Sequence, residues 1–293
     1  MRIAVYGKAF TLEARPYIEG LYKRLLSEDV VLSMYSRLDT FLRDNCSWEH
    51  EYPIFSNHKE LADFAPDVLI TIGGDGTILD AVTLVRNTGI PILGINTGRL
   101  GFLANVAKEE INQAIDKLVS GKYAINERST LMVTTSSEAP LEPNFALNEV
   151  TVSRKDTTSM ITVHTYINGE YLNSYWADGL IIATPTGSTG YSLSCGGPIM
   201  MPGSQNFVLT PIAPHNLTVR PFVIPIDFKI RLKIESRENE FLASLDSRSY
   251  SFTNDVDLFL QRSEVRIKLI QTDLQDFSAT LRNKLMWGLD RRN

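Results

Sequence analysis

The feature that most constrains the fold is a change in hydrophobic pattern near residue 121. Before that point, short apolar runs alternate with stretches in which apolar residues recur at helical spacing. The runs expected to be strands are residues 3–6, 30–35, 67–72 and 90–95, and the stretches expected to be helical are 18–26, 38–42, 77–87 and 108–119. Such alternation is typical of βα units around a parallel sheet. The first part of the chain is therefore predicted to be an α/β domain.

After residue 121 the apolar runs are short and rich in β-branched residues, as in residues 131–135, 145–152 and 161–167. Asn168 and Gly169 follow the last of these, and this pair strongly favours a two-residue hairpin turn. Residues 276–289 have a helical pattern instead. We therefore expect three parts. Residues 1–121 form an α/β domain with a Rossmann-like parallel sheet, residues 122–275 form a β-rich, mainly antiparallel domain, and residues 276–293 form a separate C-terminal segment.

Composition excludes several classes of protein. The net charge is −5, with 29 basic and 34 acidic residues, which gives no overall attraction to nucleic acid or an anionic membrane. Cys46 and Cys195 lie far apart, so they indicate neither a disulfide framework nor a zinc site. No apolar stretch approaches the ~18 residues of a membrane-spanning helix. We expect a cytoplasmic protein without a nucleic-acid or membrane partner.

The first chemical motif is Gly73-Gly74-Asp75-Gly76-Thr77, between a buried strand and a helix. Glycines there allow close approach of a ligand, and the N–H groups of a helix start favour an anion, so Gly73, Gly74, Gly76 and Thr77 are candidate phosphate-binding residues. Asp75 is a candidate proton acceptor or magnesium ligand. The structural alternative is a tight turn with Asp75 as a helix cap, which stabilises by ~1 kcal/mol. The chain has no GxxxxGK[ST] motif.

The second motif, residues 184–198, follows the apolar run 180–183 and contains four glycines and six serines and threonines. Such a segment offers many small donors to a sugar or a base edge, and an aromatic ring within it can stack on a ligand. The alternative is an ordinary long loop. The candidate binding residues are Thr184, Thr186, Ser188, Thr189 and Tyr191.

Three further positions are site candidates, each with a structural alternative. Asn148 and Glu149 interrupt an apolar run, so one of them faces the core unless the strand bends or ends there. Asp178 lies just before the strand that leads into the second motif. Phe102 belongs to the segment 96–104, which follows the strand 90–95, where an open parallel sheet places its ligands.

At these residues the sequence resembles the NAD kinase family. GGDGT alone also occurs in diacylglycerol and sphingosine kinases, and more distantly in phosphofructokinases. The combination is narrower, because GGDGT, NTGRLGFLA, the Asn-Glu pair, DGLIIATPTGSTGYSLSCGGPI and IAPHNLTVRP appear in the family's order and spacing. The resemblance spans roughly residues 3–270. It implies transfer of the γ-phosphate of ATP to the 2′-hydroxyl of the adenosine ribose of NAD, giving NADP.

The resemblance also assigns roles. It implies that Asp75 activates the ribose hydroxyl, that Mg²⁺ or another divalent metal accompanies ATP without a protein ligand that we can name, and that the C-terminal segment packs on the first domain. It implies a homodimer or homotetramer in which a neighbouring subunit completes part of the NAD site. The residues that match NAD-binding positions are Gly74, Asp75, Gly76, Phe102, Asn148, Glu149, Asp178, Thr184, Thr186, Ser188, Thr189 and Tyr191.

The chain departs from the family at Asp246, which is followed by Ser247 where a glycine is common. Lys8 and Arg99 are the candidate cations for the ATP phosphates. Two other functions remain open at this stage: a GGDGT-type lipid kinase, which would need an apolar tunnel, and a non-catalytic sensor of NAD or NADP, which would have little use for the carboxylate of Asp75.

Overall fold

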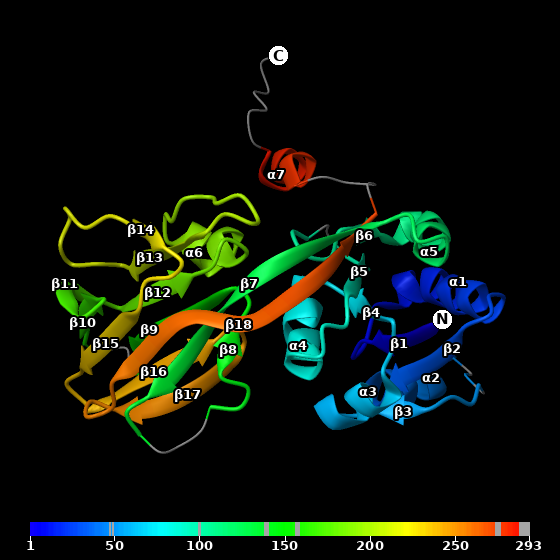
Figure 1. Ribbon diagram of the computed structural model, residues 1–293, viewed down its shortest axis with the longest axis horizontal. Helices are drawn as coiled ribbons and strands as arrows, with labels where there is room; N and C mark the ends of the chain where they lie inside the picture. Colours follow the sequence, from blue (N-terminus) through cyan, green and yellow to red (C-terminus); the bar gives the residue numbers. More distant parts are fainter. Residues whose placement is uncertain are drawn as a thin grey trace, which may run out of the picture. The chain divides into compact units, whose positions relative to one another are not determined.

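A computed structural model describes residues 1–46, 48, 50–98, 101–137, 141–155, 159–272 and 277–286. The chain divides into two compact units (Figure 1). Unit 1 combines Met1–Glu127 with the described residues from Ile267 onward, and unit 2 is Arg128–Arg266. The domain bounds expected from the sequence stay predictions. Among the described residues, no helix is both long and apolar enough to cross a membrane.

Unit 1 is built on a parallel sheet whose strands follow the order β5-β4-β1-β2-β3, with the end of β18 (Leu258–Gln271) parallel to β5 on its other side. The strands are β1 (Arg2–Tyr6), β2 (Val31–Tyr35), β3 (Ile54–Phe55), β4 (Val68–Gly73), β5 (Ile92–Asn96) and β6 (Val106–Ala107), which pairs with β5. Strands β1, β4 and β5 are buried almost throughout because helices cover both faces of the sheet. The predicted α/β architecture with a parallel sheet is confirmed.

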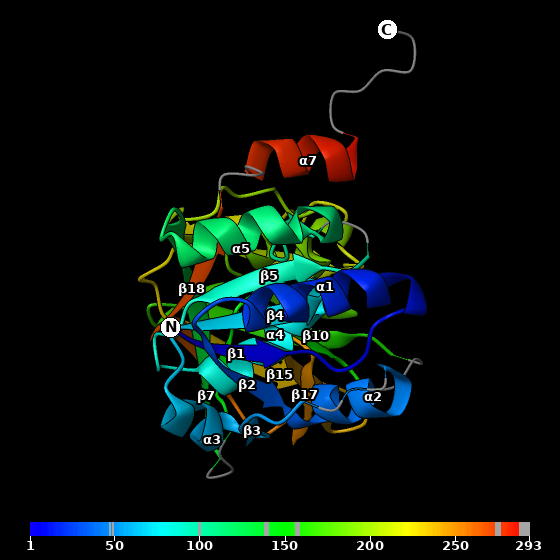
Figure 2. The ribbon, with the colours of Figure 1, turned by 90° about the vertical axis from the view of Figure 1, so that its right-hand side faces the viewer.

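The helices of unit 1 connect these strands, and Figure 2 shows α1 and α5 over one face of the sheet with α3 beyond the other. Their bounds are α1 (Arg15–Leu26), α2 (Ser36–Cys46), α3 (His58–Phe64), α4 (Asp75–Val85), α5 (Ile111–Val119) and α7 (Phe277–Leu285), with short 3₁₀ turns at Leu12–Ala14 and Lys108–Glu110. Helix α3 was not among the helices expected from the sequence. Its N-cap is nevertheless a residue type that commonly begins helices: the side chain of Asn57 accepts a hydrogen bond from the N–H of Glu60 at 3.0 Å.

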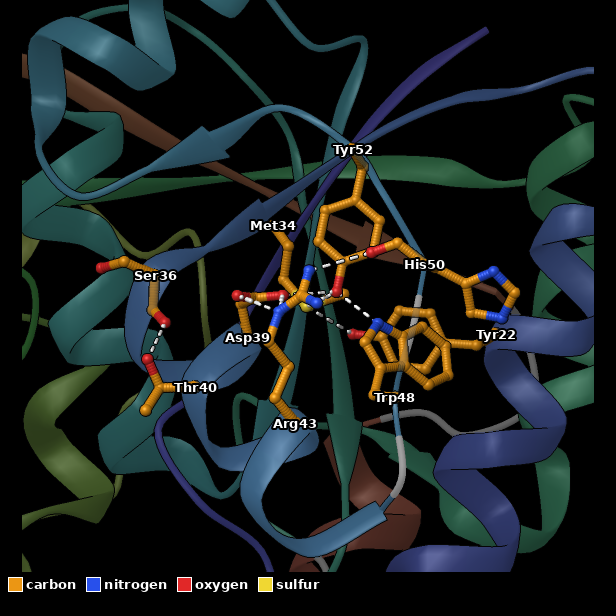
Figure 3. Close-up of polar contacts among 9 residues, drawn as sticks. All are labelled: Tyr22, Met34, Ser36, Asp39, Thr40, Arg43, Trp48, His50 and Tyr52. Carbon is orange, nitrogen blue, oxygen red and sulfur yellow. Dashed lines mark hydrogen bonds and ion pairs between the residues drawn. The ribbon is translucent and has the colours of Figure 1, made fainter.

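A polar network ties Trp48, His50 and Tyr52, which follow α2, to that helix (Figure 3). Tyr52 donates to Asp39 at 2.8 Å and accepts from the indole N–H of Trp48. Arg43 pairs with the same aspartate at 2.9 Å and donates to the carbonyl of His50 at 3.0 Å. These contacts hold the described residues between α2 and β3 against α2.

Unit 2 contains two antiparallel sheets. One has the order β14-β13-β12-β9-β16-β17, and the other has the order β11-β10-β15-β18, with β7 beside β18 and β8 beside β7. The strands are β7 (Ala124–Thr135), β8 (Phe145–Ala146), β9 (Glu149–Arg154), β10 (Ile161–Ile167), β11 (Glu170–Ala177), β12 (Gly179–Ala183), β13 (Asn206–Ile212), β14 (Phe222–Pro225), β15 (Ile230–Glu235), β16 (Glu240–Leu245) and β17 (Arg248–Thr253). Apolar side chains of both sheets meet in one core, as in a sandwich. The predicted antiparallel β-rich architecture is confirmed.

One local feature of unit 2 agrees with the sequence-based expectation, and another corrects it. Asn168 and Gly169 have φ angles of 51° and 88° and join β10 to β11, as their turn chemistry predicts. The run 145–152, expected to be one strand, is instead two, because the chain breaks between β8 and β9. The break lies at Leu147 and Asn148, and Asn148 is the first residue of the polar pair identified in the sequence.

Candidate active site

In unit 1 the candidate phosphate turn joins β4 directly to α4. Gly73 ends the strand with φ 153°, and a Cβ added there would lie 2.0 Å from the hydroxyl oxygen of Thr77, so this position requires glycine. Gly74 is the N-cap of α4, and both Gly74 and Gly76 are exposed. The turn therefore presents backbone N–H groups at the start of an eleven-residue helix to solvent. This arrangement favours an anion such as a phosphate.

Asp75, the first residue of α4, turns its carboxylate toward the segment that follows β5. Its Oδ2 accepts from the N–H of Phe102 at 2.8 Å, and its Oδ1 accepts from the N–H groups of Leu103 and Ala104 at 3.0 and 2.9 Å. A Cβ on Gly101 would lie only 1.8 Å from Oδ1, so glycine is required there. The carboxylate is thus held in one position by backbone donors, while its side chain stays 28% exposed.

A carboxylate has about four acceptor positions, and these three N–H groups occupy three of them. Among the described residues, no hydrogen bond fills the remaining position on Oδ2. Lys284 of α7 lies near this oxygen without hydrogen-bonding to it, with its Nζ 3.6 Å from Oδ2 and 4.7 Å from the centroid of the Phe102 ring. The sequence analysis did not identify Lys284, because no motif connects the last segment of the chain to residue 75.

Of the two cations that the sequence proposed for phosphate, the structure describes only Lys8. Lys8 lies at the surface and pairs with Asp80 of α4 at 2.7 Å. Arg99 lies outside the described residues. Asp80 is on the second turn of α4, so the ammonium of Lys8 is near the phosphate turn but engaged with a carboxylate.

In unit 2 the pair Asn148 and Glu149 lies where β8 gives way to β9, and Asp246 positions both. The carboxylate of Asp246 accepts from the backbone N–H groups of Leu147, Asn148 and Glu149 at 2.8, 2.8 and 3.1 Å. Asp246 occupies the turn between β16 and β17 with φ 52°, a conformation that aspartate tolerates better than most residues. The absence of the family's glycine at Ser247 does not prevent this contact.

Asn148 and Glu149 are partly buried, and each has a buried side-chain oxygen without a hydrogen-bond partner among the described residues. Among the described residues, neither Oδ1 of Asn148 nor Oε2 of Glu149 has a hydrogen-bond partner. Burial, and secondarily the nearby carboxylate of Asp246, raises the pKa of Glu149 to about 8. Native proteins rarely leave buried polar atoms unpaired, so an unpaired pair of this kind points to a ligand.

The second motif packs directly on this pair. A Cβ on Gly187 would lie 2.1 Å from the carbonyl oxygen of Asn148, and one on Gly190 would lie 3.0 Å from Oε2 of Glu149. The backbone N–H of Thr184 donates to the carbonyl of Asn148 at 2.9 Å. The glycines of the motif therefore serve close packing of the loop as well as any approach by a ligand.

Most hydroxyl groups of the motif hold the loop together. Thr184 and Ser188 are fully buried and donate to the carbonyls of Leu147 and Pro185 at 2.6 and 2.8 Å. Thr186 is buried, and the hydroxyl of Thr189 donates to its carbonyl at 3.3 Å. Tyr191 begins the short helix α6 (Tyr191–Ser194), which follows the 3₁₀ turn Gly187–Thr189. Its ring is 46% exposed and open to stacking.

Among the candidate residues of unit 2, Asp178 lies apart from Asn148, Glu149 and the second motif. It precedes β12 and pairs with Arg154 at 3.1 Å, whereas Thr184 follows the same strand. Five strand residues lie between them, a span of ~17 Å at 3.3 Å per residue. Asp178 therefore lies at the opposite end of β12 from Asn148, Glu149 and the second motif.

Among the described residues, no group of His, Cys, Asp and Glu side chains has the arrangement of a metal site. The donor set does not fit a metal held by the protein alone, since the carboxylates of Asp75 and Asp246 are engaged by backbone N–H groups. Any divalent metal here would need other ligands.

Comparisons with known proteins agree on one family. Residues 24–123 match the model of the ATP-NAD kinase N-terminal domain, and residues 147–272 match that of the C-terminal domain. The chain is 51% identical to the NAD kinase of Flavobacterium psychrophilum over 295 residues and 40% identical to that of Bacteroides fragilis over 292, with 100% of both chains covered in each case.

Solved structures show the same fold. A crystal structure of yeast NADH kinase complexed with NADH matches with a TM-score of 0.86 at 24% identity, covering 99% of this chain and 89% of that one. A crystal structure of an NAD kinase from Archaeoglobus fulgidus in complex with ATP matches with a TM-score of 0.73 at 27% identity, covering 98% of each chain.

Proposed function

The chain belongs to the NAD kinase family and transfers phosphate from ATP to NAD, and we propose that Asp75 is the general base of this reaction. The acceptor is the 2′-hydroxyl of the adenosine ribose, the transferred group is the γ-phosphoryl, and the product is NADP. The observation that carries the assignment is the carboxylate of Asp75, fixed at the start of α4 with one acceptor position left on Oδ2. A hydroxyl that donates to Oδ2 can transfer its proton there as the phosphate bond forms.

The ATP phosphates bind at the turn formed by residues 73–77. The exposed N–H groups of Gly74 and Gly76 and the N-terminus of α4 offer partial positive charge without a P-loop lysine. Mg²⁺ or another divalent metal accompanying ATP would lower the negative charge of its phosphates. The geometry of the described carboxylates supports no dedicated protein site for it.

Unit 2 carries most of the residues that we propose to bind NAD. The unpaired buried atoms of Asn148 and Glu149 support a role in holding a sugar hydroxyl or base edge. Tyr191 and Phe102 offer aromatic faces, and Thr189 is partly accessible. Thr184 and Ser188 are buried and hydrogen-bonded within the loop, where they shape the proposed NAD site.

We further propose that the enzyme is a homodimer or homotetramer and acts in the cytoplasm. The position of Asp178, at the far end of β12 from the rest of the NAD residues, supports a contribution to the site of a neighbouring copy. Both Cys46 and Cys195 are free thiols, as expected in a reducing compartment. No feature of the described residues favours a lipid kinase or a binding-only sensor over the kinase.

The direct test is NADP formation by the purified chain with NAD, ATP and Mg²⁺. NADH and diacylglycerol are compared as acceptors, and polyphosphate is compared as a donor. Phosphorylation of a dinucleotide but not of the lipid is expected. Folded protein that binds NAD without forming NADP would contradict the proposal, and phosphorylation of the lipid would replace it with the alternative kinase.

A further inference from the structure

Helix α7 presents one side to the rest of unit 1. Phe277, Thr280, Leu281 and Lys284 recur at the spacing that places residues on one face of a helix. Thr280 and Leu281 are only 4% and 6% exposed, and the ring of Phe277 lies 5.9 Å from that of Phe102. The buried face of α7 (red in Figure 1) therefore carries Lys284 to the residues around Asp75.

Lys284 contacts the proposed base without being needed to hold the helix. Its Nζ lies 3.6 Å from Oδ2 of Asp75, longer than a hydrogen bond, and 37% of its side chain is exposed. Ion pairs with this degree of exposure contribute little to stability, whereas Thr280 and Leu281 on the same helix are buried. The three N–H donors of the ammonium group thus remain available to another anion.

The reaction places such an anion at this point. The ribose oxygen forms a bond to the γ-phosphorus, the bond from that phosphorus to the bridging oxygen of ADP breaks, and the hydroxyl proton passes to Asp75. ADP leaves with the electron pair of the broken bond. Because the transferred group is anionic and approaches a carboxylate, the two repel each other unless a cation lies between them. Catalysis of phosphoryl transfer depends mainly on such positioning and charge neutralisation.

We propose that Lys284 is a catalytic residue whose ammonium group contacts an oxygen of the transferred phosphoryl group while it stays beside Asp75. This proposal rests on the assignment of Asp75 as the base. Lys284 supplies the basic residue that the motif 73–77 lacks, since the ammonium of Lys8 is engaged with Asp80 at 2.7 Å. Phe102, 4.7 Å below the ammonium, orients it through a cation–π contact.

The test compares Lys284→Met with Lys284→Arg. Methionine keeps an apolar stem over Phe102 and removes only the charge, and arginine restores a charge of different shape. Arg282→Ala is the matched control, because Arg282 is exposed on the same helix and lies off the face formed by residues 277, 280, 281 and 284. Each variant is assayed for NADP formation, for the KM of NAD and of ATP, and for thermal unfolding.

We expect kcat of Lys284→Met to fall by about 10²-fold, the usual loss for one transition-state donor. The KM for NAD and the unfolding temperature should stay near those of wild type, Lys284→Arg should recover part of the rate, and Arg282→Ala should match wild type. Unchanged kcat in Lys284→Met would overturn the proposal. So would a raised kcat, which would mean that the ammonium shields Asp75, or a loss of stability and NAD binding that arginine does not restore. If the wild type forms no NADP at all, the proposed function fails first and this inference with it.

Discussion

Gly101→Ala tests whether the backbone clamp on Asp75 sets the rate of phosphate transfer. The new Cβ would lie 1.8 Å from Oδ1 and 2.5 Å from Cγ of Asp75. The methyl and the carboxylate must separate by roughly 1.6 Å to reach ordinary van der Waals contact. Misplacement of a catalytic group by about 1 Å costs ~10²-fold in rate. We therefore expect kcat for NADP formation to fall by at least ~10²-fold.

Displacement also weakens the hydrogen bonds to Asp75 from the N–H groups of Phe102, Leu103 and Ala104. Loss of one hydrogen bond to a charged group costs ~1.5–3 kcal/mol, so protection of these amides from hydrogen exchange should fall as well. Gly98→Ala is the control in the same segment, because its Cβ would meet only Oδ1 of Asn96 at 3.8 Å. A folded Gly101→Ala protein with wild-type kcat would refute the reasoning.

Three further predictions concern unit 2. Because the pKa of Glu149 is raised to about 8 from 4.5, the folded chain holds a proton that the unfolded chain releases between these pH values. The free energy of unfolding should therefore fall as pH rises through this window, by up to ~1.4 kcal/mol per pH unit. Urea titrations of Glu149→Gln at several pH values should lack this fall. The same dependence of unfolding free energy on pH in wild type and variant would contradict the raised pKa. Asp246→Asn replaces one acceptor oxygen by an NH₂ group that faces backbone N–H groups. Calorimetry should therefore show NAD affinity reduced ~10-fold or more. Unchanged affinity would show that Asp246 does not position Asn148 and Glu149 for NAD. If Asp178 contributes to the site of a neighbouring subunit, chains carrying Asp178→Ala and chains carrying Asp75→Asn should each be nearly inactive alone. Mixed oligomers of the two, formed by refolding them together, should regain activity. No recovery in such mixed oligomers would show that Asp178 does not belong to a shared site.

The sequence predicted those parts of the fold that local patterns determine. Asn168 and Gly169 form the hairpin turn because their positive φ angles suit that turn type. The buried strand before Gly73 was recognisable from its apolar residues, and the helix after Gly74 from its periodicity. Helix α3 was missed because its seven residues are too few for a clear period, although the Asn57 cap marked its start.

The contacts that define the candidate site were beyond the sequence because they join distant segments. The residues next to Asp246 in the sequence do not indicate that its carboxylate accepts hydrogen bonds from the N–H groups of residues 147–149. In the same way, Lys284 reaches Asp75 only through the packing of α7. The motifs indicated which residues matter, whereas the donors and cations around them depend on tertiary structure. The roles of the individual site residues stay predictions until they are measured.

The most direct test of the account is the kcat of Asp75→Asn for NADP formation, measured with the NAD dissociation constant of the same preparation. Asparagine keeps the size of the side chain and one acceptor oxygen but cannot take the ribose proton. The account predicts that kcat falls ~10²–10⁴-fold, as for loss of a general base, while NAD affinity stays similar. A variant that turns over near the wild-type rate would show that Asp75 only holds the segment after β5 and that the base lies elsewhere.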